Sequence, residues 1–211
     1  MRRPPPKVPP AASASVGANF GPRVLPGTYT IRMTKDKNVY ETALRVTGDP
    51  RATHTLADRQ EQFGLAMKLH RLLGDMTFAV DRINGVRLAL DDRVGKLPQA
   101  PLGKRLRAAS GQVDELRKKI VATKEGGMIT GEERLREFLA DLYSNLVFYE
   151  GRPSLTQIER GDAIARELAD VVKRFDAWTA NELPGLNAAL AGAKLPAVQS
   201  LTRSEWEKSG P

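Results

Sequence analysis

Few side chains in this sequence have the types and spacing that catalysis or metal binding needs. The 211 residues include no cysteine, which excludes disulfides, thiolate zinc sites and cysteine nucleophiles. The two histidines, His54 and His70, have no carboxylates at metal-binding helical spacing and accompany no recognisable serine nucleophile motif. A serine–histidine–aspartate site assembled by folding stays open, because such triads are spatial rather than sequential. The sequence predicts no catalytic residue, no metal site and no cofactor.

Two carboxylate pairs and one glycine-containing segment also invite a chemical interpretation. Adjacent carboxylates on a helix, as in Asp91–Asp92 and Glu132–Glu133, do not face each other across a cleft as glycoside hydrolysis requires. The segment KEGGMITG (124–131) lacks the GK[ST] ending of a phosphate-binding loop and does not follow a strand, so we expect an interhelical turn. If this turn binds a ligand, an anion near Thr130 and Gly131 is the one to test.

The chain is basic, with a formal net charge of +8, but the excess is concentrated near its start. Residues 1–50 carry eight basic and three acidic side chains, whereas the rest of the chain carries 25 basic and 22 acidic ones. A nearly balanced body is typical of a solvated, salt-bridged surface. Because the body has no clustered basic face, we expect no nucleic-acid partner.

The first 22 residues, MRRPPPKVPPAASASVGANFGP, predict a disordered, proline-rich leader. Proline and small polar residues favour a flexible or polyproline-like chain. The positive start is not followed by the apolar region of a signal peptide, so we expect none and leave the localisation open. No apolar run approaches the roughly 20 residues of a membrane span.

Residues 23–50 predict a β-hairpin. Polar and apolar residues alternate on both sides of the turn segment TKDKN, which is the pattern of half-buried strands. Tyr29, Ile31, Leu44 and Val46 form its apolar face and are a candidate interaction surface. A lone hairpin is marginal in water, so either the helices cover this face or its partner strands lie outside the chain.

Residues 51–192 predict an antiparallel bundle of about four helices, two long and two short. The first long helix spans 55–97, where apolar residues recur in steps of four and three from Leu69 onward, interrupted by Arg87. We expect a thin end of the bundle, where only the two long helices meet. Residues 193–211 predict a short turn and a tail.

Local signals mark the ends of these helices. Three capping pairs are predicted at Thr55/Asp58, Thr130/Glu133 and Ser154/Gln157. Pro98 and Pro101 separate the first two helices, and Pro184–Gly185 predicts a kink or an interruption of the last. Between the third and fourth helices, Tyr149 or Arg152 is expected to bond the carbonyls at the helix end. These two residues are also a second candidate for partner binding.

Three stretches carry a family resemblance: LPGTYTIRMT (25–34), VATKEGGMITGEERLREFLADLY (121–143) and YEGRPSLTQIER (149–160). They resemble the C-terminal region of bacterial BNR/sortilin-like β-propeller proteins, which carry WD40/YVTN/BNR-like repeats and are often labelled glycosyl hydrolase. The resemblance covers residues ~21–211. It implies that the hairpin ends an Ig-like module, that a propeller precedes it, and that the full-length proteins are exported. This chain contains no propeller repeats, so no catalytic residue is carried over to it.

Two functional hypotheses follow. The first is a non-catalytic helical scaffolding and interaction module, a truncated or split member of that family. The alternative is an accessory part of a glycoside-hydrolase-like enzyme whose active site lies in a propeller outside this chain. The partners expected are a propeller or Ig-like domain, or further copies of the chain.

Overall fold

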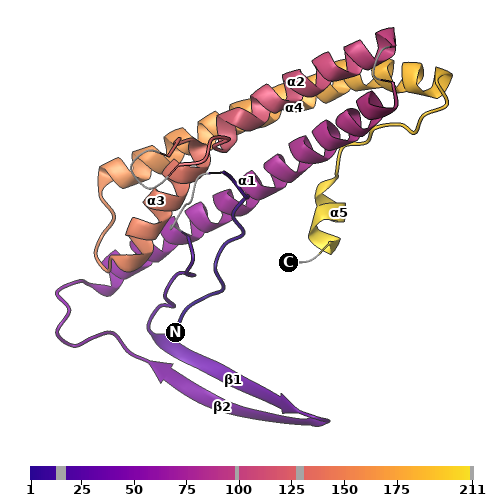
Figure 1. The fold of residues 1–211 in the computed structure, drawn as a ribbon. Coiled ribbons are helices and arrows are strands. Elements are labelled where there is room, and N and C mark those ends of the chain that lie inside the picture. The colour runs from indigo at the N-terminus through magenta and orange to yellow at the C-terminus, as the bar shows by residue number, and fades with distance from the viewer. Residues whose placement is uncertain (13–17, 98–99, 127–130, 210–211) are drawn as a thin grey trace.

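A computed structural model describes residues 1–12, 18–97, 100–126 and 131–209. It confirms the predicted fold class, a mainly helical bundle preceded by an antiparallel hairpin (Figure 1). Its elements are β1 (Gly27–Lys35), β2 (Asn38–Val46), α1 (Leu56–Lys96), α2 (Pro101–Ile120), α3 (Leu135–Phe148), α4 (Leu155–Gly192) and α5 (Arg203–Lys208).

The long helix α1 forms the centre of the core. Its 41 residues extend about 62 Å at 1.5 Å per residue. The predicted seam is buried, with Leu69, Leu73, Met76 and Val80 fully inaccessible to solvent. Arg87, the polar interruption of the seam, pairs with Asp91 at 3.2 Å and also contacts Asp114 of α2 at 3.8 Å. Apolar burial therefore holds the bundle, and the one charged position in the seam is neutralised by neighbours on two helices.

The two short helices follow one another along the two long ones. Helix α2 packs on α1 and α4, α3 does the same nearer the start of α1, and α2 and α3 touch each other little (Figure 1). The predicted thin end is therefore wrong. Sequence periodicity indicated the helix lengths but not that α2 and α3 would lie one after the other along the same two long helices.

The helix ends agree with the sequence signals in part. Thr55 and Ser154 cap α1 and α4 through the predicted reciprocal pairs, and Pro101 begins α2. Helix α3 begins later than predicted, at Leu135, with Arg134 and Glu137 at its N-terminus. Pro98 and Thr130 lie outside the described residues.

The predicted interruption of the last long helix does not occur, because α4 continues through Pro184 to Gly192. Leu183, Leu186 and Leu190 on either side of the proline are buried in the core. Their packing offsets the backbone hydrogen bond that a proline removes from a helix interior.

The segment after α4 returns along α1 instead of ending as a tail. Asn187 holds it by two hydrogen bonds to the backbone of Val198, one donated and one accepted. Helix α5 then contacts the middle of α1, where Trp206 donates to Asp81 at 2.7 Å and Arg203 pairs with Asp75 at 2.9 Å.

The described residues of the leader differ from the flexible segment that their composition predicted. Pro6 and Pro9 are buried, the Ala12 amide donates to the Ala122 carbonyl at 3.1 Å, and Arg136 of α3 donates to the Pro9 carbonyl at 2.6 Å. The partners in these two hydrogen bonds lie more than a hundred positions away in the sequence, which explains why composition did not reveal them. Within the part of the chain described, no helix combines the length and apolarity needed to cross a bilayer.

Candidate interaction surface

The hairpin is a regular two-stranded ladder. Gly27 lies opposite Val46 and Lys35 opposite Asn38, with every intervening residue paired. The two-residue turn places Asp36 in the left-handed region, at φ 57°, a conformation that aspartate tolerates better than most residues. Because directly opposed residues of an antiparallel pair project on the same side, this register decides which side chains share a face.

One face of the hairpin is almost entirely apolar. It brings together the four residues predicted from the sequence and extends them toward the tip. Its members are Tyr29, Ile31, Met33, Tyr40, Thr42, Leu44 and Val46. Met33 and Tyr40 were missing from the predicted site, although the alternation that identified Ile31 and Leu44 continues through both.

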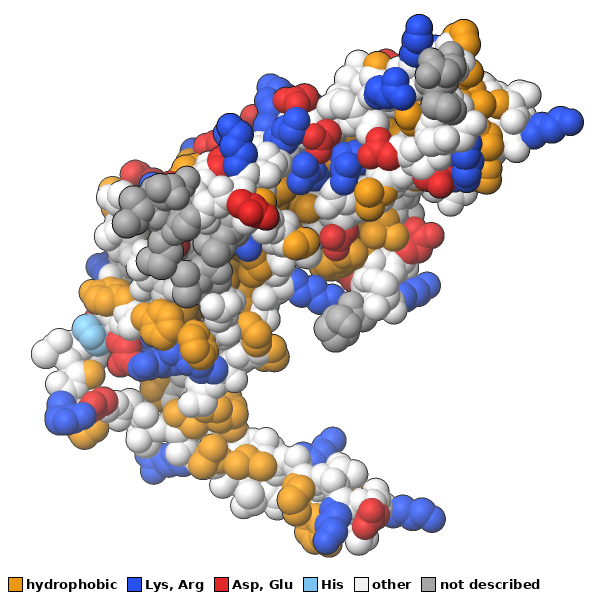
Figure 2. Space-filling view, viewed as in Figure 1, with side chains coloured by type: hydrophobic (Ala, Val, Ile, Leu, Met, Phe, Trp, Pro, Cys, Tyr) orange, Lys and Arg blue, Asp and Glu red, His pale blue; other side chains and the backbone are white. Residues whose placement is uncertain are grey.

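The helices do not cover this face. Ile31, Met33, Tyr40 and Leu44 are 43%, 55%, 52% and 38% exposed. Figure 2 shows hydrophobic side chains along the hairpin and an open gap between the hairpin and the helical body. Fully burying an apolar side chain of this size contributes about 1.5–3 kcal/mol. A partner that covered this face would therefore gain binding free energy from it.

The opposite face of the hairpin is mostly polar, with Val39 and Ala43 as its apolar members. Arg32 of β1 pairs with Glu41 of β2 across the polar face at 2.5 Å. The described sheet has two strands only, so each strand keeps one edge of unpaired backbone N–H and C=O groups. Such edges pair readily with a strand of another chain.

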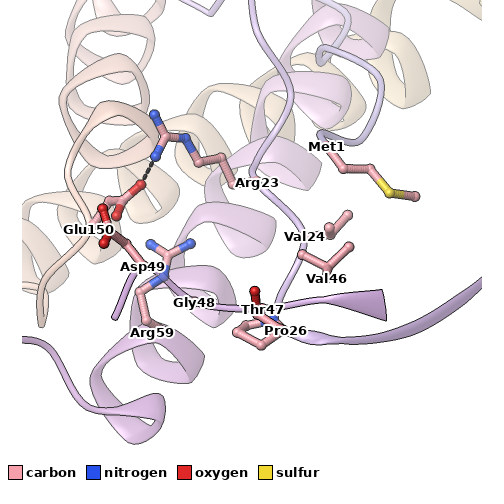
Figure 3. A pocket seen from close by; sticks show the side chains of 10 residues that line it. All are labelled: Met1, Arg23, Val24, Pro26, Val46, Thr47, Gly48, Asp49, Arg59 and Glu150. Carbon is pink, nitrogen blue, oxygen red and sulfur yellow. Dashed lines mark ion pairs between the residues drawn. The ribbon is translucent and has the colours of Figure 1, made fainter. Parts of the chain in front are cut away.

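The root of the hairpin is fixed to the bundle around a pocket of about 290 Å³. Figure 3 shows the Arg23–Glu150 ion pair beside this pocket, joining the segment before β1 to the turn between α3 and α4. Val46 also lines the pocket, so the inner end of the apolar face lies against the body. Burial and the nearby charge of Arg23 lower the pKa of Arg59, another lining residue.

The second predicted candidate, Tyr149 with Arg152, lies beside this root rather than on the hairpin face. The Tyr149 ring is 6.1 Å from the His54 ring, which precedes α1. Arg152 donates to Glu61 of α1 at 2.9 Å instead of to the carbonyls at the end of α3. The turn therefore helps to anchor α1, and the neighbouring Glu150 connects it to the hairpin.

Three of the remaining chemical candidates have structural partners. His70 lies 3.2 Å from the Pro4 carbonyl, Asp91 accepts from Ser110 at 2.5 Å, and Glu132 accepts from the Thr123 amide at 2.9 Å. The GMIT portion of KEGGMITG, residues 127–130, lies outside the described residues. Among the residues that are described, no three histidine, aspartate or glutamate side chains form a group that could hold a metal ion.

No protein-family model, curated protein or solved structure matches the chain. The resemblance stated above therefore stays a prediction, and the geometry of the hairpin is the basis for the function proposed next.

Proposed function

We propose that this chain is a non-catalytic scaffolding and interaction module that docks a β-sheet domain of another protein through its β1–β2 hairpin. The observation that carries this proposal is the continuous, exposed apolar face of the hairpin, which extends from Val46 at the root to Met33 and Tyr40 near the tip. A monomeric protein rarely leaves such a face uncovered unless it binds something.

The chemistry of the hairpin favours a β-sheet partner. Its unpaired edges supply the backbone groups that an added strand bonds, and its apolar face can lie against the inner layer of a sandwich. The resemblance of LPGTYTIRMT to the end of an Ig-like module supports the same class of partner. In that case the module would serve a propeller protein as a docking or scaffolding part.

The charge of the hairpin favours a different protein over a second copy. Between Gly27 and Val46 there are four basic and two acidic side chains, so two hairpins would meet with like net charge. Like-charge juxtaposition opposes association, whereas an acidic sheet edge would be attracted.

Site-specific photo-crosslinking tests this proposal in the cells that make the protein. A benzophenone amino acid is placed at Tyr40 on the apolar face or, as a matched control, at the adjacent Val39 on the opposite face. Both side chains are more than half exposed, at 52% and 57%, so they differ in face rather than in accessibility. We expect a covalent adduct with a β-sheet domain from Tyr40 and little or none from Val39.

Three results would contradict the proposal. Equal adducts from both positions would show that the apolar face has no special role. An adduct between two copies of this chain would assign the face to a homo-oligomer. Cleavage of aryl glycosides by the purified protein at an enzymatic rate would show that the chain is catalytic, which neither hypothesis expects.

A further inference from the structure

The leader lies against the helical body through contacts along most of its length. The Arg3 guanidinium lies 5.8 Å from the centre of the Phe63 ring, Pro6 and Pro9 are buried, and the Ala12 amide donates to Ala122. These four positions have the three-residue spacing of a polyproline II helix, and Val8 and Ala11 between them also pack against the core. The contacting residues read R-P-P-P-K-V-P, an R-x-x-P-x-x-P pattern.

The body offers hydrogen-bond donors to the leader's carbonyls. Proline lacks an N–H group, so a proline-rich segment presents carbonyl oxygens that need donors from its receptor. Arg136 of α3 supplies one to Pro9 at 2.6 Å, and the His70 ring of α1 lies 3.2 Å from the Pro4 carbonyl. The Arg136 side chain is only 10% exposed and is paired with Glu137, so this donor is fixed in place rather than a chance surface contact.

Aromatic side chains complete the site. The Lys7 ammonium lies 4.7 Å from the centre of the Trp206 ring on α5, and Phe63 contacts Arg3. Between Lys7 and Val8 of the leader and helices α1 and α5, the surface opens into a pocket of about 510 Å³. Aromatic surfaces combined with carbonyl-directed donors are the usual means by which proteins bind polyproline II segments.

The leader is held here as part of the same chain. Its first residues pair with the segment that leads back to the hairpin, where the Arg3 amide donates to Pro22 at 2.9 Å and the Val24 amide to Met1 at 3.2 Å. A tethered segment of this kind occupies its site at a high effective concentration. Another proline-rich segment can therefore enter only when the leader's own contacts are weakened.

We propose that the surface formed by Phe63, His70, Ala122, Arg136 and Trp206, here called the leader groove, is a binding site for R-x-x-P-x-x-P segments of a partner protein. Residues 1–12 occupy it as an intramolecular competitor. This site is separate from the hairpin, so the inference does not rest on the function proposed above.

The test uses the full chain carrying Pro6→Asp and Pro9→Asp, which weakens the leader and leaves every groove residue unchanged. The probe is a fluorescein-labelled peptide with the sequence of residues 1–12, and binding is followed by fluorescence anisotropy. We expect the peptide to bind this double variant about tenfold or more tightly than the wild-type chain, where the tethered leader competes. If circular dichroism shows the double variant to be unfolded, the full chain with Arg3→Ala replaces it, with a smaller expected gain.

Two controls separate the groove from general charge attraction. A peptide with alanine in place of Pro6 and Pro9 keeps every charge and is expected to bind about tenfold or more weakly, because it loses both anchoring positions. Adding Arg136→Lys to the double variant keeps a charge beside Glu137 but loses the planar Nε donor. We therefore expect the unaltered peptide to bind this triple variant about tenfold or more weakly than it binds the double variant. Equal binding of the two peptides, or no binding to a folded double variant, would overturn the proposal.

Discussion

The leader and the hairpin are neighbours in sequence but are held in opposite ways. The hairpin has a complete backbone ladder and leaves most of its side chains exposed. The described leader has a single isolated bridge, between Arg2 and Arg23, yet Pro6, Pro9, Gly21 and Pro22 are buried. Regular backbone pairing and attachment to the core are therefore independent properties in this protein.

The difference has a physical cause. In the hairpin, stabilisation comes from cross-strand pairs and from backbone bonds that its own two strands supply. In the leader, it comes from side chains of α1 and α3, including Tyr143, which donates to the Phe20 carbonyl at 2.8 Å. Equivalent substitutions should therefore lower the free energy of unfolding when they affect the leader or its contacts, and leave it almost unchanged in the hairpin.

The largest expected difference is between two glycines. A Cβ atom added at Gly21 would lie 1.7 Å from the Arg3 carbonyl oxygen, whereas one added at Gly48 has nothing within 4 Å. Gly21→Ala should destabilise the protein by about 1–3 kcal/mol, because the backbone must shift to relieve the overlap. Gly48→Ala should stay within about 0.5 kcal/mol of wild type. Thermal unfolding of both variants tests the comparison, and equal midpoints would show that the leader does not contribute to the stability of the fold.

A smaller difference is expected between two tyrosines. Tyr143→Phe removes the hydrogen bond to Phe20 and should cost about 1 kcal/mol, while Tyr40→Phe on the exposed hairpin face should cost almost nothing. Burial raises the pKa of the Tyr143 hydroxyl above its usual value, so this group stays protonated and keeps donating through the neutral range. Denaturant unfolding measures both free energies. A loss that is the same for both variants would contradict the contrast.

Acid should weaken the junction between α2 and α3, to which the leader is bonded. The hydrogen bond from the Thr123 amide and the Arg134 side chain lower the pKa of Glu132 below its ordinary value of 4.5. A carboxyl group with a lowered pKa in the fold stabilises it above its unfolded pKa, and this contribution is lost as the pH falls through the folded value. Glu132→Gln should therefore flatten the decline in stability below pH 4.5.

The matched control for that experiment is the adjacent Glu133→Gln, which removes a carboxylate without breaking the bond to Thr123. Unfolding midpoints are measured for the wild type and both variants across the acidic range. Curves for Glu132→Gln that run parallel to wild type at every pH would show that this bond has no role in acid sensitivity.

The smallest expected effect is in the hairpin. Arg32 and Glu41 form an exposed cross-strand pair at 2.5 Å, and such pairs contribute about 0.2–1 kcal/mol. Arg32→Ala should speed amide hydrogen exchange within β1 and β2 while leaving the unfolding midpoint of the bundle unchanged. A shift of the bundle midpoint by several degrees would show that the hairpin and the body unfold together, which would remove the contrast with the leader.

Local signals in the sequence predicted the elements well. The seam through Leu69 and Leu73, the caps at Thr55 and Ser154, and the alternation through Ile31 and Leu44 depend on residues a few positions apart. The fold class and the four predicted residues of the hairpin face followed from these patterns, whereas Met33 and Tyr40 of that face were missed. The Ig-like origin of the hairpin and the family resemblance stay predictions.

Long-range arrangement could not be predicted in the same way. In the sequence, Arg136 is indistinguishable from other charged residues of a helix, and Tyr143 from other packing residues. Both nevertheless donate hydrogen bonds to carbonyls of the leader more than 120 positions away. The order of α2 and α3 along the long helices depends likewise on packing against α1 and α4, which are partly distant in sequence. Neither feature has a periodic signature, because each arises from a meeting of distant segments.

The Arg23–Glu150 ion pair has a mechanical consequence. The two strands of the hairpin have nine residues each, so the hairpin is about 30 Å long at roughly 3.4 Å per residue. It is attached to the body at its root, near this ion pair. A load applied at Asp36 and Lys37 acts as a torque on the turn between α3 and α4, with the longest arm that the hairpin provides. A force applied at the tip would therefore reach the turn between α3 and α4 through the Arg23–Glu150 pair.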